Sequence, residues 1–160
     1  MDELFVLEEE AQVAQFLANR AEHEVDAGHW HEAVTLVGRL VVLWKEALLP
    51  QMQRVLGPRA RQDGMDQEVC QVLDAAGRVG SRLEDMRRAL DATDHGERTR
   101  LGAHLLLDEV RGHLSALTRG VLPRIYGACT DDDLWDLARD LDRMVDEMGR
   151  SRWRGLVSQA

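Results

Sequence analysis

The sequence predicts an all-α protein, an up-down-up-down four-helix bundle with a fifth C-terminal helix. Apolar residues recur every three or four positions over long stretches, which is the period of an amphipathic helix. No alternating run is long enough to build a sheet, and each of the three prolines sits where a helix would end. The 160 residues suffice for one compact core. We expect the helical domain to span residues 1–149 and a basic, flexible tail to span residues 150–160.

The first two helices form the first antiparallel pair. The first is expected over residues 3–26, with Asp2 as its N-cap and Gly28 as the glycine that ends it. The second is expected over residues 31–54, with a bend where Pro50 lacks a backbone donor. Leu56-Gly57-Pro58 is a stop signal, and we expect a loop to continue from there to about residue 64.

Three further helices follow. The third is expected over residues 65–91 and the fourth over residues 97–122, ending near Pro123. Thr130 and the carboxylates of residues 131–133 are suited to the positive N-terminal end of a fifth helix, whose apolar face continues to Met148. Short connections between four long helices predict antiparallel neighbours.

The charge and the cysteines limit the class of partner. A net charge of -9 argues against binding to nucleic acid, whose phosphates require a basic surface. No apolar run approaches the ~20 residues of a membrane span, and the N-terminus lacks the features of a signal peptide. Cys70 and Cys129 form no paired motif, so we expect a reduced, cytoplasmic protein without membrane partners. No dinucleotide, P-loop or HExxH motif is present, and we expect no cofactor.

Two segments carry a resemblance to a known family. Residues 40–50 and residues 113–123 each end in an apolar pair followed by a proline. In the hemerythrin (HHE cation-binding) family, the second and fourth helices place a His-x-x-x-Glu motif before such an ending. The Thr130–Leu134 segment also resembles the acid-capped terminal helix of bacterial members. The chain therefore resembles a divergent hemerythrin-like protein.

The resemblance implies that most metal ligands are missing. The family holds two irons with five histidines and two bridging carboxylates. The positions that correspond to ligands in this chain are Leu40 and Trp44, a position near Ala76, His113 and Leu117, and a position near Glu10 or Ala11. Aliphatic and indole side chains offer iron no lone pair. The resemblance thus implies a degenerate site that binds no metal.

The large indole of Trp44 suggests that the interior has been repacked. Ala76 and Gly80 on a neighbouring inner stripe remove volume where Trp44 adds it, and protein cores are filled to crystal-like density. This hypothesis requires Trp44 to contact the third helix at the level of Ala76 and Gly80. Any small apolar pocket would then be lined by Trp44, Leu40, Ala76, Gly80 and Leu117.

Glu10 and His113 are the candidate acid and base, provided that both side chains point inward. For Glu10 the alternative is that residues 8–10 are solvated. For His113 the alternative is a half-buried histidine bonded to Glu109, one turn earlier.

Other polar residues favour the surface. His23, His29 and His31 lie among acidic residues near the first turn, but their spacing matches no structural zinc motif. His104 and Asp108 are expected to pair on the surface of the fourth helix.

Three functions remain open. The leading interpretation is a binding or regulatory module whose partner is a protein or a small apolar molecule, with Trp135 as a possible interface anchor. The alternative is a small metal-independent enzyme that uses the former metal cavity for an organic substrate, with Glu10 and His113 as its catalytic groups. The third is a divergent metal-binding or oxygen-binding protein whose ligands lie in another register.

Overall fold

The computed structural model describes residues 6–57, 66–92 and 95–123, and every regular element in these ranges is helical. The elements are α1 (Val6–Asp26), α2 (Trp30–Leu43), the π-helix η2 (Trp44–Leu48), α3 (Leu49–Leu56), α4 (Asp66–Asp91), α5 (Glu97–Ser115) and the π-helix η4 (Ala116–Val121). The predicted N-cap Asp2, the fifth helix and the tail lie outside the described residues. None of the described helices is long and apolar enough to cross a membrane.

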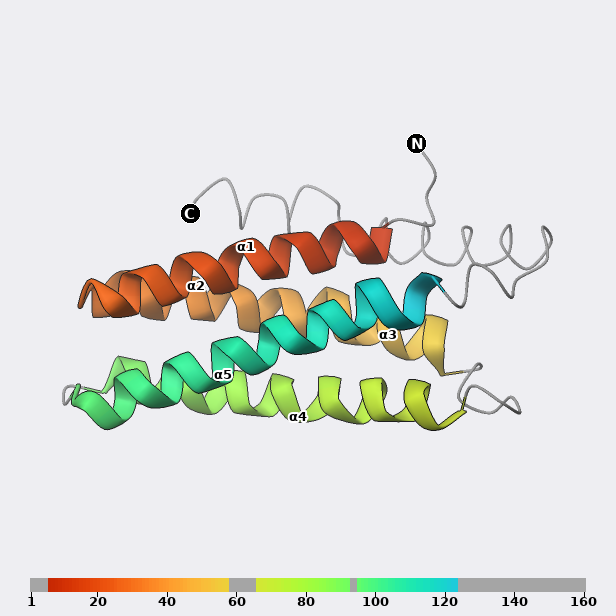
Figure 1. Cartoon of the computed structure of the whole chain (residues 1–160). Helices are drawn as coiled ribbons and strands as arrows, with labels where there is room; N and C mark the ends of the chain where they lie inside the picture. Colours follow the sequence, from red (N-terminus) through yellow and green to blue (C-terminus); the bar gives the residue numbers. More distant parts are fainter. Residues whose placement is uncertain (1–5, 58–65, 93–94, 124–160) are drawn as a thin grey trace.

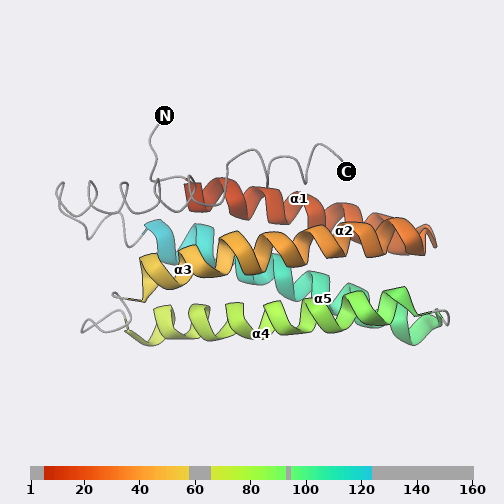
Figure 2. The same cartoon turned by 180° about the vertical axis from the view of Figure 1, so that it is seen from behind.

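The helices lie side by side around a shared interior (Figures 1 and 2). Helix α1 packs against α2 and α5, and α4 packs against the same two helices. Helix α2, η2 and α3 follow one another without a break and form one continuous rod. Along the α1–α5 contact, Asn19 pairs with Arg111 and Asp26 pairs with His104, so the two helices run in opposite directions.

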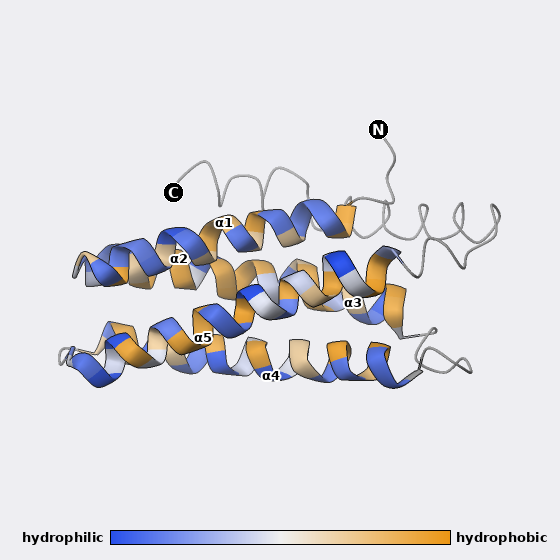
Figure 3. Ribbon diagram, in the orientation of Figure 1, coloured by the Kyte–Doolittle hydropathy of each residue, from blue (hydrophilic) through white to orange (hydrophobic). Residues whose placement is uncertain are grey.

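Apolar side chains from every helix form the core, and the orange stripes of Figure 3 mark these faces on the ribbon. On α1 the buried apolar residues return every three or four positions, as a 3.6-residue period requires. The largest fully buried side chains belong to Trp44, Leu7, Leu17, Leu40, Leu43, Leu48, Met52, Leu56, Leu83, Leu90, Leu107 and Leu114. This contiguous packing is the main stabilising term of the fold.

Gly28 ends α1 as expected from the sequence. Its φ of 75° lies in the left-handed region, which glycine adopts without a Cβ penalty. The Gly28 amide donates to the Val25 carbonyl at 3.1 Å, and the His29 amide donates to the Glu24 carbonyl at 2.9 Å. This is the hydrogen-bond pattern of a glycine-terminated helix, and it turns the chain into α2.

Pro50 does not end its helix, which continues to Leu56. The π-helix η2 comes directly before it, with the Leu49 amide donating to the Trp44 carbonyl one residue further back than in an α-helix. The π-helix η4 comes before Pro123 in the same way. A proline ring clashes with the carbonyl four residues earlier, and a wider turn gives that carbonyl room. Both π-helices therefore follow from the prolines.

Candidate functional site

Trp44 fills the centre of the bundle. Its side chain is fully buried, and the indole Nε1 donates a hydrogen bond to the Ala76 carbonyl at 2.9 Å. A Cβ placed on Gly80 would lie only 3.0 Å from Trp44 Cδ1. The contact with Ala76 and Gly80 that the repacking hypothesis requires is therefore present. Glycine at position 80 lets the indole lie against the α4 backbone.

The other positions that the resemblance aligns with ligands are also part of the packed core. Leu40, Ala76 and Leu117 each have a relative exposure of 0% and belong to the same apolar cluster as Trp44. In the described part of the chain, no group of three or more histidine, cysteine, aspartate or glutamate residues is placed to hold a metal ion. The buried polar side chains of the described interior are Glu10, Gln51 and His113, besides the indole nitrogen of Trp44.

His113 lies beside Trp44 and is nearly enclosed. Its ring centre is 5.5 Å from that of the indole, the planes are tilted by 50°, and 7% of the residue is exposed. Burial lowers the pKa of His113 to about 4, so the imidazole is neutral at pH 7. Its Nε2 has no hydrogen-bond partner within the described ranges. The expected carboxylate partner, Glu109, instead pairs with Arg82 on α4.

Glu10 is fully buried, so the alternative in which it is solvated is wrong. One of its oxygens accepts a hydrogen bond from Gln51 Nε2 at 2.8 Å. Burial raises the pKa of Glu10 to about 8, against the opposing effect of the Gln51 hydrogen bond, and the charge of Glu9 raises it further. Glu10 Oε2 and Gln51 Oε1 are both buried without a partner among the residues described.

Glu10 and His113 do not form the predicted acid–base pair. Glu10 is hydrogen-bonded to Gln51, whereas His113 lies against Trp44. Trp44 precedes Gln51 by seven residues on the continuous rod of α2, η2 and α3. Seven helical residues separate the two levels by about 10 Å along the rod. Neither oxygen of Glu10 bonds to His113, because one accepts from Gln51 and the other has no partner in the described structure. Proton transfer between the two groups has no direct path in this arrangement.

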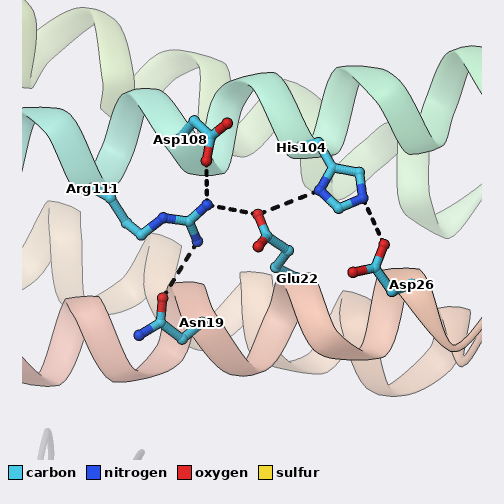
Figure 4. A network of polar contacts seen from close by, with 6 residues as sticks. All are labelled: Asn19, Glu22, Asp26, His104, Asp108 and Arg111. Atoms are coloured by element: carbon cyan, nitrogen blue, oxygen red, sulfur yellow. Dashed lines mark hydrogen bonds and ion pairs between the residues drawn. The ribbon is translucent and has the colours of Figure 1, made fainter.

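A polar network joins α1 to α5, and Figure 4 shows its members, Asn19, Glu22, Asp26, His104, Asp108 and Arg111. His104 Nε2 lies 2.7 Å from Asp26, and His104 Nδ1 lies 3.3 Å from Glu22. Desolvation acts against the charged imidazole, but the hydrogen bonds and charges of Asp26 and Glu22 outweigh it and raise the pKa of His104. The sequence predicted Asp108 as the partner of His104, and the structure pairs Asp108 with Arg111 instead.

Arg111 anchors the other half of this network. Its Nη2 donates to Glu22 at 2.6 Å and also to Asp108, and its Nη1 donates to Asn19 at 3.3 Å. The guanidinium is thus held in one orientation by groups on both helices. Glu24, another acidic residue near the first turn, instead pairs with His29 at 2.8 Å.

Beyond Arg111, the contact between α1 and α5 opens into a groove of about 430 Å³, which we call the α1–α5 groove. Its polar lining consists of Gln12 and Gln15 from α1 and of Arg111, Ser115, Thr118 and Arg119 from the other side. Ala11 and Leu114, both 2% exposed, also line it. Sequence reasoning missed the groove because two helices far apart in the chain supply its sides and no motif marks it. The sequence feature that could have indicated the groove is the set of polar uncharged residues beside the apolar stripes, Gln12 and Gln15 in one helix and Ser115 and Thr118 in the other.

Comparison with known proteins adds no relative. A scan against protein-family models, a search of curated proteins and a search of solved structures each returned no match to this chain. The resemblance to the hemerythrin family therefore rests on the residues quoted from the sequence alone.

Proposed function

We propose that the chain is a divergent hemerythrin-like up-down-up-down bundle, completed by a fifth helix, that has lost its di-iron site and serves as a binding module. The observation that carries this proposal is the placement of Trp44. Where the family would keep a ligand, an indole lies against Gly80 and donates its only polar hydrogen to the Ala76 carbonyl. An interior held in this way is suited to stability.

A binding role accounts for the polar groups better than the enzymatic alternative. A general acid and a general base must both reach the substrate. Glu10 is fully enclosed at the level of Gln51, and His113 lies beside Trp44 about two turns away along the rod. The separation of these two groups argues against shared catalysis on one substrate.

Features of the surface favour binding. Leu101 and Leu105 lie one turn apart on α5 and are each 60% exposed, an arrangement suited to contact with another protein. The α1–α5 groove provides a concave site of the size that small molecules occupy. Both features open to the outside of the bundle.

Aerobic iron loading tests the loss of the di-iron site. The full chain is incubated with excess ferrous iron, desalted and measured by elemental analysis, together with Trp44→Phe as a matched variant. We expect less than one bound iron per chain for both proteins. The difference in tryptophan fluorescence between the parent and Trp44→Phe is the Trp44 signal. We expect iron to leave this signal unchanged. Two tightly bound irons per chain, or quenching confined to the Trp44 signal, would contradict the proposal.

A further inference from the structure

We propose that the α1–α5 groove binds a small organic carboxylate, whose charged head contacts Arg119 and whose apolar body lies over Ala11 and Leu114. The inference deepens the proposed binding function by naming the class of ligand. It concerns the outer surface between two helices, whereas the loss of the metal site concerns the core.

The charge of the lining points to an anion. The chain carries a net charge of -9, yet among the described residues no carboxylate lines the groove and two guanidinium groups do. Arg111 is neutralised locally by Glu22 and Asp108. Arg119 has no ion pair within the described residues, and its side chain is exposed. A cation beside a polar concavity, on an otherwise acidic protein, is complementary to an anionic head group.

The shape and the neutral groups of the groove favour a carboxylate with an organic body. A guanidinium presents donors in a planar fork that matches the two oxygens of a carboxylate. The amides of Gln12 and Gln15 and the hydroxyl of Ser115 can donate further hydrogen bonds. Thr118 already donates its hydroxyl hydrogen to the Leu114 carbonyl at 2.9 Å, so it can only accept from a ligand. Ala11 and Leu114, each 2% exposed, form a small apolar floor between these groups.

The π-helix η4 explains why both arginines reach one groove. In an uninterrupted α-helix, a residue eight positions after another is rotated from it by about 80°. Arg119 lies eight positions after Arg111 and within the π-helix η4 (Ala116–Val121), which begins five residues after Arg111. Wider turns rotate less per residue, which brings Arg119 back toward α1. Such wide turns occur frequently at functional sites.

Titration of the full chain with benzoate, followed by NMR of the side-chain amides and the arginine Nε–H groups, tests the inference. Benzyl alcohol serves as the neutral analogue, and inorganic phosphate serves as an anion without an apolar body. We expect benzoate to produce saturable shifts at Gln12, Gln15 and Arg119 with a dissociation constant below about 1 mM. Both comparison compounds should bind more weakly.

Two variants locate the site. Arg119→Gln should weaken benzoate binding about tenfold or more, as expected for the loss of one charge-assisted hydrogen bond. Arg78→Gln removes the same charge from an exposed position on α4 and should leave binding unchanged. Ser115→Trp should block the groove while the circular dichroism spectrum stays that of the parent.

Several results would overturn the inference. They are the absence of saturation by benzoate, equal binding of benzyl alcohol, preference for phosphate, or equal losses in Arg119→Gln and Arg78→Gln. None of them bears on iron binding, so the groove and the lost metal site fail independently.

Discussion

Replacement of Glu10 by glutamine should raise the free energy of unfolding, and the gain should grow as the pH rises. Glu10 is fully buried, and its pKa is raised from 4.5 to about 8. Between these values the folded state binds a proton that the unfolded state has released. Unfolding therefore releases a proton, and raising the pH favours unfolding. A glutamine at position 10 has no proton to lose, and it can exchange two hydrogen bonds with Gln51, whose Oε1 has no partner in the described structure.

The size of the effect follows from the shift. One pKa unit corresponds to about 1.4 kcal/mol. At pH 7 the pH lies about 2.5 units above the pKa of this carboxyl in the unfolded state. The ionisation of Glu10 therefore lowers the free energy of unfolding by about 3 kcal/mol at pH 7 and by about 5 kcal/mol above pH 8. Near pH 4 the lowering vanishes, because both states are protonated there. Glu10→Gln should gain these amounts over the parent.

Urea denaturation monitored by circular dichroism near pH 5, 7 and 9 provides the measurement, with the free energies obtained by linear extrapolation. Glu8→Gln removes the same charge from a half-buried position on α1 and should leave the pH dependence of the parent intact. The reasoning about burial would be refuted if Glu10→Gln were no more stable than the parent at pH 9. It would also be refuted if Glu8→Gln showed the same gain.

Two further predictions concern the helix contacts. Gly77→Ala should raise the free energy of unfolding by about 1 kcal/mol, because an added Cβ there meets no atom within 4 Å. Gly80→Ala should be about 1–3 kcal/mol less stable than Gly77→Ala, because its Cβ would press on Trp44. Thermal denaturation of both variants checks this, and equal gains would mean that the indole can move aside. His104→Gln should remove stability that is present below pH 6.5 and lost as the pH rises through the elevated pKa of His104. Because His104 is partly exposed, added salt should reduce the difference in the free energy of unfolding between the parent and His104→Gln in denaturation experiments. If salt had no effect, the ion pair of His104 with Asp26 would not contribute to stability.

The sequence was most informative where structure depends on local pattern. Apolar periodicity and terminal residues placed the described helices within a few residues, and Gly28 was correctly assigned as the end of α1. The contact of Trp44 with Ala76 and Gly80 was also anticipated, because a large residue and two small ones face the same interior. Both inferences need only the helical period and the volume of the side chains.

The sequence was least informative where a residue depends on a distant partner. For Glu10 the sequence left burial and a solvated position both open, because its partner Gln51 lies 41 positions away. The continuation of the second helix past Pro50 was anticipated with a bend at that residue, but the π-helix η2 that precedes Pro50 was not. The α1–α5 groove depends on how two helices distant in the chain pack against each other, which no single segment encodes.

The two buried titratable groups act on stability in opposite directions. The pKa of His113 is lowered from 6.5 to about 4, so the unfolded state binds more protons in that interval and stability falls as the pH falls. Glu10 lowers stability as the pH rises from 4.5 to about 8. Their slopes offset each other between about pH 4.5 and 6.5, where both titrate. From about pH 6.5 to 8 Glu10 is the one of these two groups that still titrates, and its effect adds to the loss from His104, so the parent should lose stability mainly in that interval. In Glu10→Gln the opposing slope of His113 is exposed, and stability should instead rise with pH up to about 6.5.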